Sequence, residues 1–311
     1  MTAWQTVTTV ANELGESPFW HPHEQMLYWV DIPGKKILRA NVTMGSVQTW
    51  PMPCEPGCIA PAASGGLVIA LRDGIYRAHQ WNGALQRIAP APYDTSRLRF
   101  NDGKADPKGR FWAGSYCEQR GDPTAALYAM HTHAGQSNTL VCMVDRATVA
   151  NGLAWSPDAK TLYWADTAQA VIWAWDWQAD SNTLCNRRIF HQFSAKPDGW
   201  AYGQPDHDAY WGRPDGAAVD LDGNYYVAMY EGGCVIKLSP VGQVLARIPA
   251  PAVCVTMPCF GGDDLKTLYI TTARKGRTAQ ELADRPQSGC VFSMRVDVPG
   301  LPVNFFGIEP L

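Results

Sequence analysis

The sequence has no long hydrophobic run, no excess of basic residues and no cysteine framework. No segment approaches the roughly 20 unbroken apolar residues of a membrane span, and the first ten residues, MTAWQTVTTV, have neither the basic nor the apolar part of a secretory signal. The 26 Lys and Arg residues stand against 29 Asp and Glu residues, so no basic stripe is available to follow a phosphate backbone. We therefore expect a soluble, cytoplasmic protein with no membrane and no nucleic acid as partner, and nothing in the sequence implies a protein partner.

The nine cysteines are odd in number and scattered, and a chain of 311 residues that is 46% hydrophobic can build a large core without disulfides. We expect reduced thiols. The pairs Cys54/Cys58 and Cys254/Cys259 fit no zinc-binding spacing, so they predict no metal site. The chain also has no G-x-S-x-G motif and no nucleotide-binding glycine motif, which argues against serine-nucleophile and nicotinamide chemistry.

The chain does contain a repeat, in which a turn of Gly, Pro, Asp or Lys residues precedes a short apolar or aromatic run. The runs begin at six residues separated by 40, 44, 51, 63 and 43 positions: Leu27, Leu67, Phe111, Leu162, Tyr225 and Leu268. This spacing is typical of a β-propeller, and Val-, Ile-, Tyr- and Trp-rich runs between the markers predict further strands. The sequence predicts an all-β fold, a single six-bladed propeller domain over residues 1–311, with four-stranded antiparallel blades around a central channel. The last blade should borrow a strand from residues 7–14.

Equivalent positions in the repeat carry side-chain oxygens. Ten or eleven residues before four of the six markers stand Glu16, Asn101, Asn151 and Asp215. These residues should begin the innermost strands and converge at one end of the channel. Carboxylate and amide oxygens suit Ca²⁺, Mg²⁺ or Mn²⁺, and Zn²⁺ also accepts carboxylate. The alternative is that the Asn-Gly and Asp-Gly pairs are ordinary turn formers.

Four segments resemble, in order, the regucalcin (senescence marker protein) and gluconolactonase family, from about Gly15 to about Arg274: LGESPFW, RFNDGKADPKGRFWAGS, NGLAWSPDAKTLYWADT and PDGAAVDLDGNYYVA. The resemblance implies a six-bladed propeller that binds one divalent cation at the channel mouth and hydrolyses sugar lactones. By motif position it implies three metal ligands, Glu16, Asn151 and Asp215. It also implies two substrate contacts, Arg99 and Asn101. Some members carry an acidic pair where this chain reads YCEQR, so Glu118 is expected to act there alone.

In the mechanism that we expect, the cation polarises the lactone carbonyl and Asp215 activates water, or Asp215 serves only as a metal ligand. Trp112, Tyr116 and Trp155 are candidates for the pocket wall. Two alternatives stay open, a non-catalytic metal- or metabolite-binding propeller and a hydrolase of other lactones or esters. Arg99 favours an enzyme, because an ion binder needs no substrate contact, and Arg99 with Glu118 favours a polyhydroxylated substrate.

Overall fold

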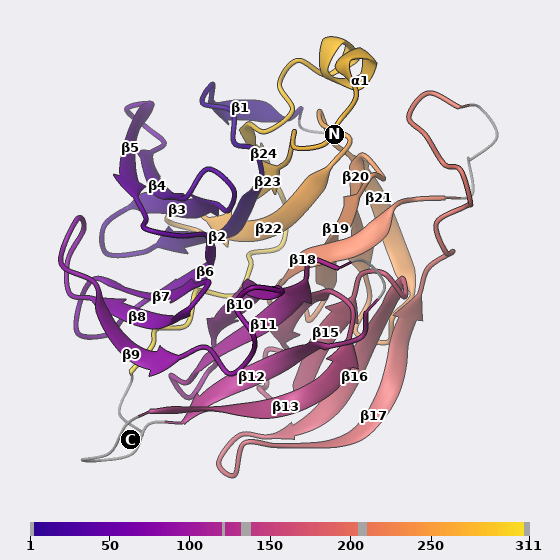
Figure 1. Cartoon of the computed structure of the whole chain (residues 1–311). Helices are drawn as coiled ribbons and strands as arrows, with labels where there is room; N and C mark the ends of the chain where they lie inside the picture. The colour runs from indigo at the N-terminus through magenta and orange to yellow at the C-terminus, as the bar shows by residue number, and fades with distance from the viewer. Residues whose placement is uncertain (1–2, 120–121, 132–137, 205–209, 308–311) are drawn as a thin grey trace.

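The computed structural model describes residues 3–119, 122–131, 138–204 and 210–307, and it arranges their strands as six four-stranded antiparallel sheets around an axis (Figure 1). The first three blades are β2 (Gly15–His21), β3 (Met26–Asp31), β4 (Lys36–Asn41) and β5 (Ser46–Pro51); β6 (Pro56–Pro61), β7 (Leu67–Leu71), β8 (Gly74–Ala78) and β9 (Gln86–Pro90); and β10 (Leu98–Ala105), β11 (Phe111–Cys117), β12 (Ala125–His131) and β13 (Thr139–Ala147). The other three are β14 (Ala150–Trp155), β15 (Thr161–Asp166), β16 (Val171–Gln178) and β17 (Thr183–Gln192); β18 (Arg213–Val219), β19 (Tyr225–Tyr230), β20 (Cys234–Leu238) and β21 (Val244–Pro249); and β22 (Val255–Gly261), β23 (Thr267–Thr272), β24 (Val291–Arg295) and β1 (Gln5–Thr8). The predicted six-bladed propeller is confirmed.

The N-terminal strand closes the ring, because β1 pairs antiparallel with β24, with Gln5 opposite Ser293. The predicted closure is therefore right, but its placement at residues 7–14 is wrong beyond Thr8. After Thr8 the chain leaves the sheet and turns toward β2. There the backbone N–H groups of Glu13 and Leu14 each donate to the Asp31 carboxylate over 3.1 Å, so these residues cannot continue β1.

In every blade the outermost strand is less buried than the three strands inside it. All residues of β2, β6, β14 and β22 are buried, whereas the outer strand β21 has no fully buried residue. Adjacent blades pack their large side chains between sheets, with Trp29 and Trp112 completely buried. All nine cysteines are free, in agreement with the expected reduced thiols. Among the described residues, no helix has the length and apolar character needed to cross a bilayer.

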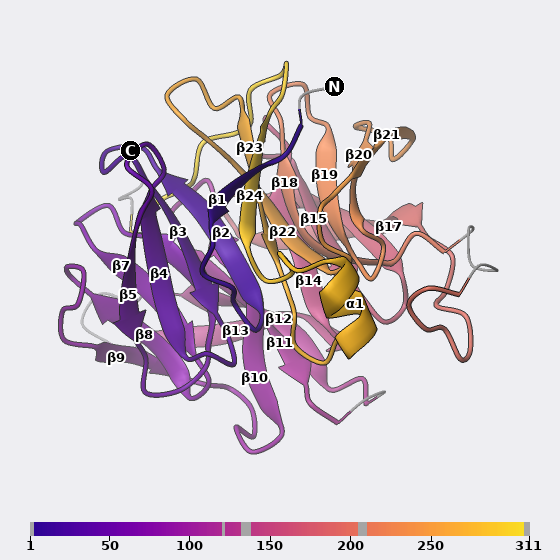
Figure 2. The same cartoon turned by 90° about the horizontal axis from the view of Figure 1, so that it is seen from above.

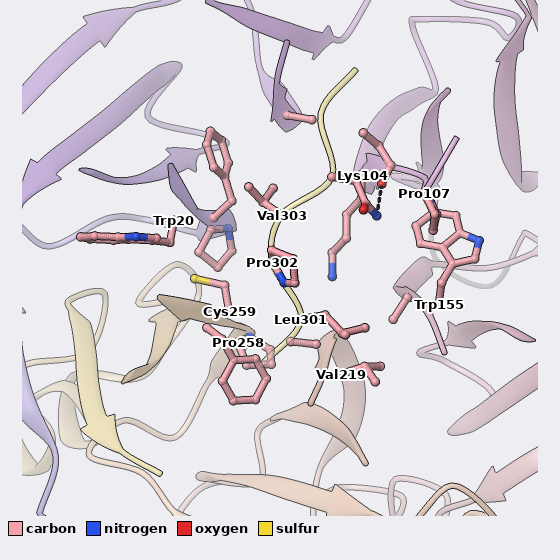
Figure 3. Close-up of a pocket in the computed structure, with 18 of the residues that line it drawn as sticks. Trp20, Lys104, Pro107, Trp155, Val219, Pro258, Cys259, Leu301, Pro302 and Val303 are labelled. Atoms are coloured by element: carbon pink, nitrogen blue, oxygen red, sulfur yellow. Dashed lines mark hydrogen bonds between the residues drawn. The ribbon is translucent and has the colours of Figure 1, made fainter. Parts of the chain in front are cut away.

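The two ends of the channel differ in chemistry. We call the end where β2, β6, β10, β14, β18 and β22 begin the mouth; helix α1 (Ala279–Asp284), in the β23–β24 connection, lies at this end (Figure 2). At the other end, residues 300–306 cross the channel: the Leu301 N–H donates to Val219 O over 2.9 Å, and the Asn304 side chain donates to Ala105 O over 3.1 Å. They cover a mostly apolar cavity of about 350 Å³, into which Lys104 points (Figure 3).

Candidate active site

The inner strands are irregular where the predicted site residues lie. The pairing register shifts between Glu16 and Phe19 in β2, and at corresponding places in β10, β14 and β18. A bulge of this kind bends the strand and redirects side chains that would otherwise alternate between faces. The four predicted oxygen donors stand at these shifts, near the start of their strands, and all four are buried.

The glycines that follow two of these donors allow close packing. Gly152 has φ +62°, and a Cβ there would lie 2.4 Å from the hydroxyl of Tyr225. At Gly216 a Cβ would lie 2.4 Å from Met257 Cγ. Both glycines lie inside strands, so the alternative interpretation of the Asn-Gly and Asp-Gly pairs as ordinary turns is wrong.

A chain of hydrogen bonds links three blades across the mouth. The Arg99 guanidinium donates to Asn101 Oδ1 over 2.8 Å, and Asn101 Nδ2 donates to Asn151 Oδ1 over 2.8 Å. Asn151 Nδ2 donates to Thr167 Oγ1 over 2.7 Å, and the Thr167 hydroxyl donates to Pro214 O over 2.7 Å. The structure therefore brings together three of the predicted residues and joins them to the backbone beside Asp215.

The two predicted carboxylate ligands are in an unfavourable environment for negative charge. Burial raises the pKa of Glu16 well above its ordinary value, and the charges of Asp215 and Asp102 raise it further. Burial and the charge of Asp102 likewise raise the pKa of Asp215, against the opposing effect of Arg213. Carboxylates from blades 1, 3 and 5 thus repel one another in a buried space, and a bound cation would relieve this repulsion.

Asp102 belongs to this group although the repeat comparison did not identify it. Its Oδ2 accepts a hydrogen bond from the Leu153 N–H over 3.0 Å. Its Oδ1 is buried and, within the part of the chain that the structure describes, has no hydrogen-bond partner. The offset of ten residues from Phe111 selects Asn101 and not its neighbour. Regular alternation would turn the two side chains to opposite faces, and the bulge in β10 allows Asp102 to act on the same space.

These residues fit a hard divalent cation. Over the described ranges, no three His, Cys, Asp or Glu side chains form a group that could hold a metal, so a site would depend on the amide oxygen of Asn151 with Glu16 and Asp215. All three supply oxygen, which is the ligand that Ca²⁺, Mg²⁺ and Mn²⁺ prefer. The buried carboxylates repel one another, and Asp102 Oδ1 has no hydrogen-bond partner among the described residues. Both features favour the binding of a positive ion here.

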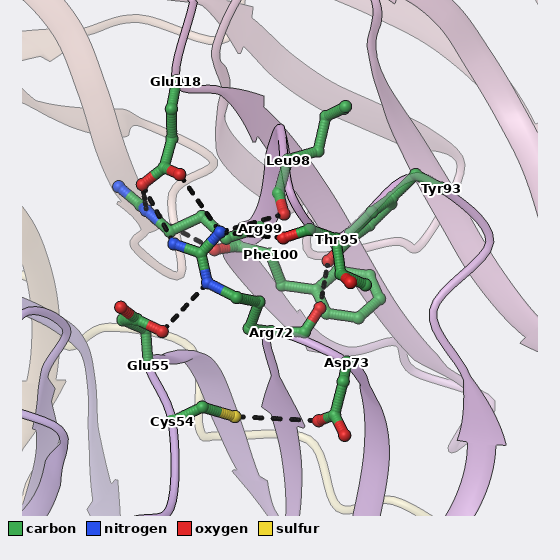
Figure 4. A network of polar contacts seen from close by, with 10 residues as sticks. All are labelled: Cys54, Glu55, Arg72, Asp73, Tyr93, Thr95, Leu98, Arg99, Phe100 and Glu118. Atoms are coloured by element: carbon green, nitrogen blue, oxygen red, sulfur yellow. Dashed lines mark hydrogen bonds and ion pairs between the residues drawn. The ribbon is translucent and has the colours of Figure 1, made fainter.

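Glu118 lies at the rim, in a network that includes an arginine absent from the expected site (Figure 4). Arg72 donates to both Glu118 oxygens, over 3.1 and 3.0 Å, and to Glu55 over 2.9 Å. Arg99 Nε lies 4.0 Å from Glu118, and the Arg99 guanidinium stacks on Tyr116. Glu118 is therefore close to Arg99 but is held mainly by Arg72, from the neighbouring blade.

Of the three aromatic residues considered for the pocket wall, only Tyr116 borders the group at the mouth. Trp112 and Trp155 are buried between blades 3 and 4, with ring centres 5.9 Å apart. The Trp112 indole donates to Asp106 over 2.9 Å, and Trp155 borders the cavity at the other end of the channel. These tryptophans stabilise the packing of the blades and do not line the mouth.

The fold and the site define a β-propeller with a buried, oxygen-rich polar centre at one mouth of its channel. Residues 14–274 match the family model described as the SMP-30/Gluconolactonase/LRE-like region. The chain belongs to this family, as its motifs predict.

Relatives match along nearly the whole chain. A 6-deoxy-6-sulfogluconolactonase of Pseudomonas putida is 42% identical over 294 residues, which make up 94% of this chain and 94% of the relative. Regucalcin of Danio rerio is 32% identical over 295 residues, again 94% of each chain. The crystal structure of a calcium-binding protein, regucalcin, of Agrobacterium tumefaciens has a TM-score of 0.87 at 21% identity and covers 99% of this chain and 98% of that one. At this identity the likeness shows the fold alone.

Proposed function

We propose that this protein is a sugar lactonase, which opens aldonolactones to aldonic acids and depends on one divalent metal ion. The observation that carries the proposal is the contact chain from Arg99 through Asn101 to Asn151. It connects a guanidinium, which can bind hydroxyl or carboxylate oxygens, to the buried oxygens of a candidate metal site. Membership of the family, and a 42% identical relative named for a sulfonated gluconolactone, support a sugar lactone as the small-molecule substrate.

Glu16, Asn151 and Asp215 would hold the ion, for which Ca²⁺, Zn²⁺, Mn²⁺ and Mg²⁺ are the candidates. When bound, the ion would act as a Lewis acid on the lactone carbonyl. Asn101 would keep the Asn151 amide oriented, because its Nδ2 donates to the Asn151 oxygen. Metal removal should therefore abolish turnover without unfolding the propeller.

Asp215 would act as the general base. It accepts a proton from the attacking water while the water oxygen bonds to the carbonyl carbon. The ring ester bond then breaks, and the proton passes from Asp215 to the leaving ring oxygen. Burial makes Asp215 a stronger base, whereas a bound cation makes it a weaker one, so the pH profile would report the balance.

Arg99 and Asn101 would hold the sugar hydroxyls or the forming carboxylate, and Glu118 would contact a further hydroxyl from the rim. Such directed contacts orient the lactone before reaction. We also propose that residues 1–311 form one domain, because β1 joins the start of the chain to the last blade. The cytoplasmic location remains a prediction from the sequence.

Acid release from a lactone panel, followed in a pH-stat, tests the function. The panel contains glucono-, galactono-, xylono- and arabinonolactone and 6-deoxy-6-sulfogluconolactone, each with chelated protein and with each candidate metal. We expect metal-dependent turnover of at least one lactone. Binding of metal or lactone without turnover above the spontaneous rate would instead favour a non-catalytic binding protein.

A further inference from the structure

Arg213 in blade 5 occupies the strand position that Arg99 occupies in blade 3. Arg99 stands two residues before Asn101 on β10, and Arg213 stands two residues before Asp215 on β18. In both strands the register shift lies just beyond the arginine. Arg213 is also near enough to Asp215 for its charge to act on that carboxyl.

The two arginines also have equivalent neighbours. Each is paired with a tyrosine of the next strand, Arg99 with Tyr116 and Arg213 with Tyr230. The guanidinium carbon lies 4.8 Å from the ring centre of Tyr116 in the first pair and 5.3 Å from that of Tyr230 in the second. Stacking on a tyrosine fixes the guanidinium plane and leaves its edge for hydrogen bonds. Two matching arginine–tyrosine pairs therefore flank blade 4.

A second resemblance is the glutamate beside each pair. Glu231 follows Tyr230 and accepts from Arg213 Nη2 over 3.0 Å, from Lys196 over 2.8 Å and from Arg277 over 3.3 Å. Burial works against its ionisation, but these three cations together lower the pKa of Glu231. It is therefore an ionised carboxylate surrounded by three positive charges.

Arg213 and Lys196 are less engaged by carboxylates than Arg277 is. Among the described residues, Glu231 is shared by all three cations, and the buried Glu281 accepts from Arg277 Nη2 over 2.6 Å. The charge of Arg213 also acts on Asp215, which is a proposed ligand of the metal ion. Once Asp215 binds that ion, Glu231 is the one described carboxylate left for Arg213 and Lys196.

Arg213 and Lys196 are also the accessible members of the cluster. The Arg213 side chain is 26% exposed, against 10% for Arg99, and the Lys196 side chain is 35% exposed. The Arg213 Nε atom itself is buried and has no hydrogen-bond partner among the residues that the structure describes, so the exposed part of this side chain is the far end of the guanidinium. Lys196 Nζ lies 4.8 Å from the ring centre of Trp200, so an aromatic surface borders the donors.

We propose that Arg213 and Lys196 bind an anionic, tetrahedral substituent, such as a sulfonate or a phosphate, at the end of the lactone remote from its carbonyl. This inference rests on the proposed lactonase function and specifies its substrate class. The oxygens of the substituent accept hydrogen bonds from the guanidinium and the ammonium, which are stronger than bonds to a neutral hydroxyl. A neutral lactone offers these two cations only uncharged acceptors.

The test compares kcat/KM for gluconolactone, 6-deoxy-6-sulfogluconolactone and 6-phosphogluconolactone. Wild-type protein should prefer at least one anionic lactone by about tenfold or more, and added salt should reduce the preference. Arg213→Gln and Lys196→Gln should each lower kcat/KM for that lactone by about tenfold, mainly through KM, with a much smaller loss for gluconolactone. Arg188→Gln, which removes an exposed positive charge from the outer strand of blade 4, is the matched control and should change neither rate.

The outcomes separate the inference from the function. Hydrolysis of gluconolactone without preference for either anionic lactone would overturn the inference and leave the lactonase function standing. An equal loss on all three substrates in both variants would also overturn it, because the cluster would then have a structural role. If Arg213→Gln does not fold, Lys196→Gln and the salt dependence decide. Absence of turnover with every lactone would overturn the function and the inference together.

Discussion

Asn101 donates from Nδ2 to Oδ1 of Asn151 over 2.8 Å, and this bond joins blade 3 to blade 4 inside the candidate active site. It determines which end of the Asn151 amide is oxygen, because the opposite end donates to Thr167 over 2.7 Å. The two bonds together fix the orientation of the Asn151 amide, with its oxygen on the side of Asn101 and its nitrogen on the side of Thr167. Thr167, which is not one of the proposed ligands, therefore helps to orient the proposed ligand Asn151.

Thr167→Val should weaken metal binding by about tenfold, because it keeps the shape of the side chain but removes the acceptor for Asn151 and the bond to Pro214. A competition titration against a chelating dye measures the dissociation constant. Thr167→Ser retains the hydroxyl and should bind the metal almost as wild type does. Equal affinity of the valine variant and wild type would show that the amide needs no such support.

Gly152→Ala should destabilise the protein by about 3 kcal/mol, the sum of the left-handed backbone penalty and a clash. The new Cβ would lie 2.4 Å from the hydroxyl of the rigid, buried Tyr225. Gly45 is a matched control, since its φ is +67° but a Cβ there meets nothing within 4 Å, so Gly45→Ala should cost only about 1 kcal/mol. Urea unfolding compares the two, and equal losses would mean that close packing at Gly152 is unimportant.

Glu231→Gln should destabilise the protein more at neutral than at acid pH. The three cations lower the pKa of Glu231 from its ordinary value of 4.5, so its contribution is complete above that pH and is lost as the pH falls through the folded-state pKa. At pH 7 we expect a loss of about 2 kcal/mol in the free energy of unfolding, because Lys196, Arg213 and Arg277 lose their shared partner. The difference should shrink below pH 4.5.

Urea unfolding of chelated protein at several pH values measures this effect. The control is Asp176→Asn, which removes an exposed carboxylate paired with Arg188 and should have a smaller effect at neutral pH. A difference between wild type and Glu231→Gln that stays constant from pH 7 to well below pH 4.5 would show that the charge of Glu231 does not stabilise the blade 5 cluster.

The regular part of this molecule could be predicted from the sequence. Each of the six markers is the first or second residue of the second strand of a blade, because turn residues and apolar runs recur at the blade period. The same period found Glu16, Asn101, Asn151 and Asp215. Their burial and the bonds among the two asparagines and their neighbours agree with that alignment.

The irregular part could not be predicted. Asp102 acts on the site because of a bulge, and bulges leave no mark in a simple alternation of side chains. Arg72 and Glu118 lie 46 residues apart in the sequence and on neighbouring blades, so no local spacing in the sequence predicts their contact. Arg213 does have a signal in the sequence, because it stands two residues before Asp215 as Arg99 stands two residues before Asn101.

Hydrolysis of aldonolactones by wild type and Asp215→Asn, followed in a pH-stat with chelated and metal-supplemented protein, tests the central claim most directly. Asp264→Asn is the control, since it removes an exposed carboxylate that pairs with Arg295. We predict metal-dependent acid release by wild type and the control, and a loss of more than about 100-fold in Asp215→Asn, which lacks both the ligand charge and the base. Equal turnover by Asp215→Asn and wild type, or turnover that survives complete chelation, would contradict the account.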